Sequence, residues 1–313
     1  MSMYKYIAKR VGLSLFTTLI IIVILFLLLQ LMPGSPFNNE RLTDSQRVVL
    51  NQKYGLDKPL IEQVAIYVKN MITGDFGVSY NIQQNYPVSS LIVTRYAYTI
   101  KLGVSAFVVG VLAGLVLGIF SALKHNSIFD TGTTVLAMLG NSIPSYILAL
   151  GCVYFLAFKT GWFPLTYDTL MPVKSSILPV IALAIGPMAI TARYTRNEMI
   201  EVMGSEYITL AETKGMKRIR IIVVHGLRNA LIPLITTMPA MLMGLLTGST
   251  VAEQIFAIPG IGSLFIKAIQ TNDYNVVITL AFIYSIMFII MLLVIDILYG
   301  IIDPRIRLSG GDK

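Results

Sequence analysis

Residues 206–228 form a densely charged segment between two apolar runs. This charged segment carries two acids, five bases and His225, one of only two histidines in the chain. Such groups could transfer protons or bind a metal, but no carboxylate stands at H-E-x-x-H spacing and His125 lies in a different loop. We therefore expect His225 to be structural, hydrogen-bonded near the start of an apolar span, and we expect no metal site.

Other kinds of chemistry are also excluded. The sequence has no G-x-x-x-x-G-K-[ST] phosphate-binding loop, so the chain itself is not expected to be an NTPase. It has no nucleophile elbow and no pair of buried carboxylates, and Cys152 is its only cysteine, which excludes an intrachain disulfide and a cysteine metal cluster. We expect no enzyme activity and no cofactor bound by this chain.

The composition predicts a polytopic all-α membrane protein. Hydrophobic residues make up 55% of the chain and charged residues 13%, with a mean hydropathy of +0.74. A bilayer core takes about 20 helical residues to cross. On that criterion the predicted spans are six, at residues 9–32, 99–123, 132–157, 176–195, 231–251 and 276–301. The first run is too long for a cleaved secretory signal, so we expect it to be retained.

Basic residues beside the spans predict the orientation. If the N-terminus is cytoplasmic, fourteen lysines and arginines flank the spans on the inside and three, Lys159, Lys174 and Lys267, on the outside. By the positive-inside rule both termini and the charged segment are then cytoplasmic. Attraction to anionic lipid explains the net charge of +8 more simply than nucleic acid does, so no nucleic-acid partner is expected.

The long loop after the first span, residues 33–97, carries helix signals. Residues 43–46, "TDSQ", have capping-box spacing and Gly55 could end the helix that follows. Pro59 suits a first helical position and Gly74 a helix end. An apolar stripe lies between them, made of Ile61, Val64, Ala65, Val68, Met71 and Ile72. We expect a small helical extracytoplasmic insertion, with an amphipathic helix in the membrane interface as the alternative.

Within the charged segment the residues predict a short helix over 206–214. Ser205 could cap it, Glu206 suits its first turn, Lys214 its last turn, and Gly215 its end. About nine residues are too few for a stable helix in water. We therefore expect a partner to hold this helix, through exposed Tyr207, Leu210 and Ala211.

The spans are nearly free of ionisable residues, so any path through them is expected to be polar but uncharged. Candidates are Asn141, Ser142, Pro144 and Ser145 in the third span, and interhelical packing by small polar residues is the alternative. Gly244 and Gly248 share a helix face, for which close packing is the default and a moving gate the alternative. Of the titratable residues near the spans, Asp296 and Arg193 are expected to be structural, and Glu253 and Asp273 to line a loop.

The charged segment resembles the "EAA" loop of ABC-importer permeases, with Ala211 in the triplet, Gly215 after it, and His225 and Leu227 in the closing positions. Thr209 and Leu210 depart from the Glu-Ala of that motif. "HGLRNALIP" (225–233) resembles the oligopeptide/dipeptide/nickel branch specifically. Six further blocks agree: "LMPGSPF", "YGLDKPLIEQ", "GDFGVSY", "GNSIPSYILAL", "AEQIFAIPGIGSLFIKAIQTNDY" and "DPRIR".

This resemblance implies a type I ABC importer permease fold. Its parts are a cytoplasmic N-terminus and first helix (1–32), the extracytoplasmic loop (33–97), a five-helix core (98–302) with a coupling loop at 196–230, and a cytoplasmic tail (303–313). It further implies a cell (inner) membrane location and an assembly of two permeases as a heterodimer, two ATP-binding subunits that hold ATP and Mg, and an extracytoplasmic substrate-binding protein. Glu206, Tyr207, Leu210, Ala211, Lys214, Gly215, His225 and Leu227 would form the ATPase-coupling site.

Short peptides are the expected substrate, and nickel or a metal chelate is the alternative within the same branch. Two other classes stay open on the residues alone. An ion-coupled secondary transporter would need an intramembrane acid, for which Asp296 is the candidate, and a peptide-sensing membrane receptor would not need ATPase contact.

Overall fold

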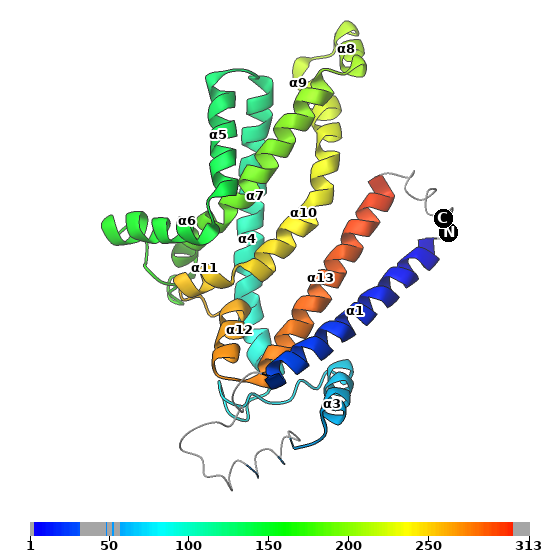
Figure 1. The fold of residues 1–313 in the computed structure, drawn as a ribbon. Coiled ribbons are helices and arrows are strands. Elements are labelled where there is room, and N and C mark those ends of the chain that lie inside the picture. The colour runs from blue at the N-terminus through cyan, green and yellow to red at the C-terminus, as the bar shows by residue number, and fades with distance from the viewer. Residues whose placement is uncertain (1–2, 32–47, 49–51, 53–56, 303–313) are drawn as a thin grey trace. The chain divides into compact units, whose positions relative to one another are not determined.

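The computed structural model describes residues 3–31, 48, 52 and 57–302, and this described part is built almost entirely from helices (Figure 1). The principal helices are α1 (Met3–Leu31), α3 (Leu60–Thr73), α4 (Val88–Leu123), α5 (Ile128–Ser142), α6 (Ser145–Cys152), the π-helical η1 (Val153–Lys159), α7 (Pro172–Met203), α8 (Glu206–Thr213), α9 (Arg218–Arg220), the π-helical η2 (Ile221–Leu227), α10 (Arg228–Gly248), α11 (Thr250–Ile255), α12 (Ile261–Gln270) and α13 (Tyr274–Ile302).

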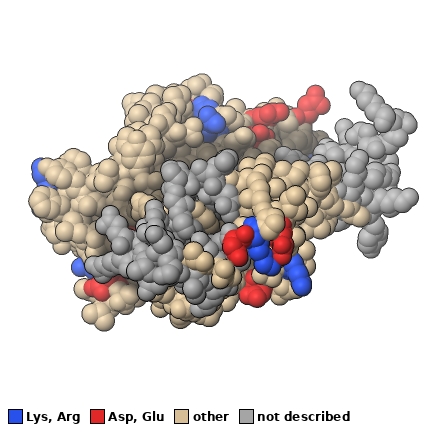
Figure 2. All heavy atoms as spheres, turned by 60° about the horizontal axis from the view of Figure 1, so that its bottom comes forward, with Lys and Arg blue, Asp and Glu red and all other residues tan. Residues whose placement is uncertain are grey.

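The chain divides into two compact units. The first contains the residues up to Tyr98 and those from Pro259 to Leu293, and the second runs from Thr99 to Ile258 and takes up the chain again from Val294. Both α4 and α13 therefore contribute to each unit. Figure 2 shows that much of the described surface on one face carries neither acids nor bases, as expected of a chain that contacts lipid.

The predicted spans are present in order. Four helical stretches are long and apolar enough to cross a membrane: α4, α7, the continuous helix Arg218–Ile255 and α13. The bent pair Ile128–Ser142 and Ser145–Lys159 adds a fifth if its two halves form one span. The helix α1, which is 29 residues long, lies where the first span was predicted, so the helices follow the order of the six predicted spans.

The third predicted span, residues 132–157, is broken in the middle. Its two halves meet at an angle of 103°, so that α6 leaves the end of α5 sideways (Figure 1). The cause is Pro144, which has no N–H to donate and disfavours a helical residue before it. Ile143 is accordingly extended, with φ −82° and ψ 122°.

In the first unit, α3 occupies the predicted place but differs in detail. It ends at Gly74 (φ 76°) as expected, whereas Pro59 is the residue before the helix and not its first member. Val64 and Met71 pack into the core of this unit, but Ile61 and Ile72 are 84% and 80% exposed, so only part of the apolar stripe is buried. The expected cap at residues 43–46 and the stop at Gly55 lie outside the described residues.

Asp273 connects the loop before α4 to the start of α13. Its fully buried carboxylate accepts a hydrogen bond from the Ser79 hydroxyl at 2.5 Å and from the backbone N–H groups of Tyr80, Asn81 and Ile82 at 3.0–3.1 Å. Asp273 lies in a loop, as expected, but its burial and its four hydrogen bonds were not predicted. Four donors compensate the cost of burying this charge and fix the loop against α13.

In the second unit, α4 and α7 approach closely along three glycines. A Cβ atom added to Gly110, Gly114 or Gly118 would lie 2.6–2.7 Å from carbonyl oxygens of α7, those of Ala184, Met188 and Ala192 respectively. Such contacts are shorter than real Cβ atoms make, so only glycine fits there. The glycine spacing of four residues is the sequence signal for this interface, and the interface was not predicted from it.

Glu253, which was expected to line a loop, is also fully buried and lies on the helix α11. Its carboxylate accepts hydrogen bonds from the hydroxyls of Thr99 at 2.7 Å and Ser249 at 3.1 Å. Glu253 therefore joins α11 to α4 inside the second unit.

Candidate functional site

The helix predicted in the charged segment is present as α8, and its end has the expected geometry. Gly215 adopts a left-handed φ of 71°, its N–H donates to the carbonyl of Glu212 at 2.9 Å, and the N–H of Met216 donates to that of Ala211 at 3.3 Å. This pair of hydrogen bonds is the Schellman motif. At the other end, Ser205 precedes the helix as expected, but its hydroxyl donates back to the Val202 carbonyl and does not cap α8.

One face of α8 packs against the rest of the second unit. Ile208 and Ala211 are buried together with Ile221, and Met203 and Met216 cover this cluster. The expectation that Ala211 is exposed is wrong, because a residue three positions after Ile208 shares its face. Ile208 was the missed residue, and that spacing was the available signal.

The opposite face of α8 is open. Tyr207 is 43% exposed and Leu210 is 55% exposed, while Glu206 and Lys214 are exposed charges at the two ends. Figure 1 shows α8 beyond the ends of α7 and α10, where this face is free to meet a partner. The side-chain amide of Asn229 donates to the Tyr207 hydroxyl at 3.1 Å and so ties α8 to the beginning of α10.

His225 and Leu227 lie in η2, the π-helical turn that leads into α10, and both are partly buried. The expected hydrogen bond of His225 is not found among the described residues. The residue of η2 that packs against α8 is Ile221.

A buried ion pair joins the same end of α7 to the turn between α4 and α5. Asp130 is 3% exposed and accepts from the Arg196 guanidinium, from the Ser121 hydroxyl at 2.5 Å and from the Asn126 N–H at 2.9 Å. Nδ1 of His125 lies 3.3 Å from both the Asp130 carboxylate and the Arg196 guanidinium. Arg196 is one of the fourteen bases counted on the inside, whereas Asp130 was not predicted as a functional residue.

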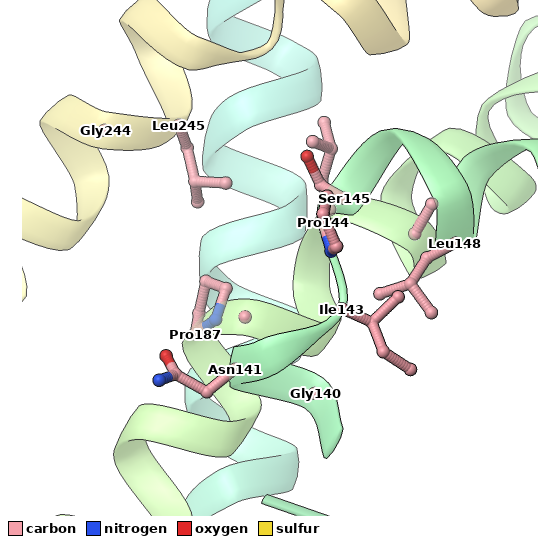
Figure 3. A pocket seen from close by; sticks show the side chains of 12 residues that line it. Gly140, Asn141, Ile143, Pro144, Ser145, Leu148, Pro187, Gly244 and Leu245 are labelled. Carbon is pink, nitrogen blue, oxygen red and sulfur yellow. The ribbon is translucent and has the colours of Figure 1, made fainter. Parts of the chain in front are cut away.

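The break between α5 and α6 opens a cavity of about 290 Å³ in the second unit. Asn141, Pro144 and Ser145 line it, as do Pro187 of α7 and Leu245 of α10. Figure 3 shows Asn141 near Pro187, with Leu245 projecting toward them from α10. Three of the four predicted path residues are thus brought to one cavity.

Three glycines also line this cavity, and two of them, Gly186 of α7 and Gly244 of α10, have open space around them. A Cβ atom at either position would meet nothing within 4 Å. Close packing at Gly244 was the default expectation, and it is wrong for this residue. The surroundings of Gly248 and the side chain of Asp296 lie outside the described part of the structure.

A second cavity of about 120 Å³ lies next along α5 and α7 in the direction of α8. Asn141 lines both cavities, and Ser142, the fourth predicted path residue, lines the second one with Arg193. The break in α5–α6 therefore presents amide and hydroxyl groups to open space, where they can exchange hydrogen bonds with a passing molecule. Among the described residues no group of three or more His, Cys, Asp or Glu side chains could hold a metal ion.

Residues 114–308 match the protein family described as "Binding-protein-dependent transport system inner membrane component". The dipeptide transport system permease protein DppB of Lactococcus lactis is 41% identical over 307 residues, which cover 98% of this chain and 100% of that protein. DppB of Bacillus subtilis is 42% identical over 307 residues, 98% of this chain and 99% of that protein. The oligopeptide transport system permease protein OppB of Escherichia coli K12 is 37% identical over 306 residues, 97% of this chain and 100% of that protein.

Two solved structures share the fold at low sequence identity. A crystal structure of an amino acid ABC transporter with histidines has a TM-score of 0.53 at 18% identity, covering 67% of this chain and 92% of that chain. An inward-facing conformation of the MetNI methionine ABC transporter has a TM-score of 0.54 at 18% identity, covering 68% of this chain and 96% of that chain.

Proposed function

This chain belongs to the family of binding-protein-dependent transport system inner membrane components, and we propose that it forms, with a second permease, the membrane pathway of an ATP-driven importer of short peptides. The membership confirms the resemblance to ABC-importer permeases. Peptides are the proposed cargo because the relatives that match nearly the whole chain are dipeptide and oligopeptide permeases. Nickel or a metal chelate is not favoured by these relatives.

The observation that carries the coupling role is the two-sided character of α8. Its inward face is fixed by Ile208 and Ala211, and its outward face offers Tyr207 and Leu210 to a partner. A helix held on one side by the membrane subunit and on the other by an ATP-binding subunit moves as one body when the ATPases close. ATP and Mg are bound by those partners, and this chain contributes no covalent chemistry.

We propose the cavities at the α5–α6 break as part of the path. Asn141, Ser142, Pro144 and Ser145 would exchange hydrogen bonds with peptide amides there, and the glycines Gly186 and Gly244 would leave room for side chains. ATP binding would favour the form that opens toward a loaded binding protein, because the closed ATPases bind α8 better in that form.

The proposed orientation places both termini, α8 and the Asp130–Arg196 pair on the cytoplasmic side of the inner membrane, and α3 and α12 outside. The proposed assembly is a heterodimer of permeases with two ATP-binding subunits and an extracytoplasmic substrate-binding protein. The counts of flanking bases support the orientation, and the family description supports the binding protein.

A cross-linking experiment tests the coupling role. Cysteine is placed by Leu210→Cys in a Cys152→Ser background, and cross-links to the ATP-binding subunits are measured in the assembled transporter with and without ATP. We expect a cross-link that changes with nucleotide. Contact in neither state would contradict the coupling role of α8. Thr94→Cys, on an exposed part of α4 in the other unit, is the matched control and is expected to give no cross-link.

A further inference from the structure

Arg193 differs from every other residue that lines the two cavities, because it alone is charged. It lies on α7 beside Asn141 and Ser142 of α5 and is exposed. Within the described part of the chain it makes no ion pair or hydrogen bond. An arginine that faces a cavity inside a membrane protein without an acidic partner is costly, and such residues commonly serve binding.

The next arginine on α7 provides the contrast. Arg196, three residues further on, is held by the buried carboxylate of Asp130, with Nε–Oδ1 at 2.5 Å and Nη2–Oδ2 at 2.8 Å. The structure therefore neutralises one of these two arginines completely and leaves the other available. The structural role expected for Arg193 is to reach from the inner end of its span toward lipid headgroups, and this role is the alternative that the test below must exclude.

The position of Arg193 agrees with a role in passage. The smaller cavity follows the larger one along both α5 and α7 in the direction of α8, and Asn141 belongs to both. A molecule that leaves the larger cavity toward α8 meets Ser142 and Arg193 next. The guanidinium matches a carboxylate in planar shape and in its fork of donors, and charge-assisted hydrogen bonds strengthen where water is scarce.

We propose that Arg193, with Asn141 and Ser142, forms a carboxylate subsite that takes the free C-terminal carboxylate of a peptide in transit. The proposal rests on the peptide-import function proposed above. Every unmodified peptide carries this group, whatever its side chains. The subsite can therefore bind peptides of any sequence, along a path that is otherwise uncharged. Because a peptide must also leave, one charge with two neutral polar neighbours suits transient binding.

The test uses the complete transporter, reconstituted in lipid vesicles and supplied with saturating peptide-loaded binding protein. Uptake rates are compared for trialanine with a free carboxylate and for trialanine amide. We expect Arg193→Gln to lower uptake of the free acid about tenfold relative to wild type, since a hydrogen bond to a charged group is lost. Uptake of the amide should change less than about twofold, and Arg193→Lys should retain most of the free-acid rate.

Lys101→Gln is the matched control, because Lys101 is an exposed cation on α4 that lines neither cavity. Equal loss with both peptides in Arg193→Gln would overturn the proposal, as would no loss with either, which is the result expected if Arg193 only reaches toward lipid headgroups. If the wild-type transporter does not import trialanine amide, the two Arg193 variants are compared with the free acid alone. The proposal is then overturned if Arg193→Lys loses as much uptake as Arg193→Gln. Failure of the wild-type assembly to import either peptide would instead contradict the proposed function.

Discussion

Arg196 of α7 donates to both carboxylate oxygens of Asp130 at the start of α5, so the end of α7 that precedes α8 is fixed to the α4–α5 turn. Eleven residues further along, α5 carries Asn141 at the cavities. A displacement of α8 is thus connected through α7 and this ion pair to the helix that lines the path.

Asp130→Ala should lower stability and coupling together. Removing the carboxylate leaves Arg196 without its partner, for which we expect a cost of about 2–3 kcal/mol, because Arg196 keeps some contact with water. In the assembled transporter, ATP hydrolysis should persist while peptide uptake per ATP falls. Thermal unfolding and the uptake-to-hydrolysis ratio measure the two effects, with Asp57→Ala, an exposed carboxylate, as control. A normal ratio in the folded variant would show that the pair does not transmit motion.

Gly215→Ala should weaken the end of α8. Its φ of 71° is easily adopted by glycine but strained for alanine, and we expect a cost of about 1 kcal/mol. Since α8 is only eight residues long, that cost should fray the helix and reduce ATP-driven uptake. Gly204→Ala is the control, because Gly204 has a right-handed φ of −86° and an added Cβ meets only atoms at 3.6 Å. Equal uptake by the two variants would argue against the importance of this turn.

Leu210→Asp should uncouple the transporter without unfolding it. The side chain is 55% exposed, so a charge there is tolerated by the isolated subunit but not inside an apolar contact with an ATP-binding subunit. We expect normal expression, impaired copurification of the ATPases and loss of uptake. The control is Ile72→Asp, an equally drastic change at an 80% exposed position of α3. Full uptake by Leu210→Asp would mean that another surface makes the contact.

Gly186→Leu should narrow the path. A Cβ atom at this position has open space around it, so the leucine fills the larger cavity instead of displacing its walls. We expect uptake of peptides with bulky side chains to fall about tenfold and that of glycine peptides less, as steric discrimination in a pocket predicts. Gly132→Leu is the control, because Gly132 has equally open surroundings outside both cavities. Equal effects on small and large peptides would contradict a path at this cavity.

Much of the architecture was predictable because membrane spans depend on local hydrophobicity. Gly215 was predictable for the same local reason, since a left-handed helix end favours glycine. Which side of α8 is buried could be predicted only in part. Leu210 was correctly expected to be exposed, whereas Ala211 is buried. Ala211 packs with Ile221, which lies ten positions later in the chain.

The remaining features depend on contacts between distant residues. Asp273 and Ser79 are 194 positions apart, and Asp130 and Arg196 are 66 apart, so neither pair has a local signal. Pro144 could be recognised as a disturbance of a helix, but the 103° bend depends on how α6 packs against α7 and α11. The cavities follow from that bend, which is why the path residues could be proposed from the sequence but their grouping could not.

The central claim is that this chain forms a peptide pathway driven by ATP-binding partners. It is tested most directly by uptake of a labelled dipeptide into vesicles that contain the whole assembly, with ATP supplied to the ATP-binding subunits. We predict accumulation that requires ATP, the binding protein and those subunits, and that is insensitive to collapse of ion gradients. Accumulation that continues without the ATP-binding subunits, or that is driven by an ion gradient and abolished by Asp296→Asn, would contradict it.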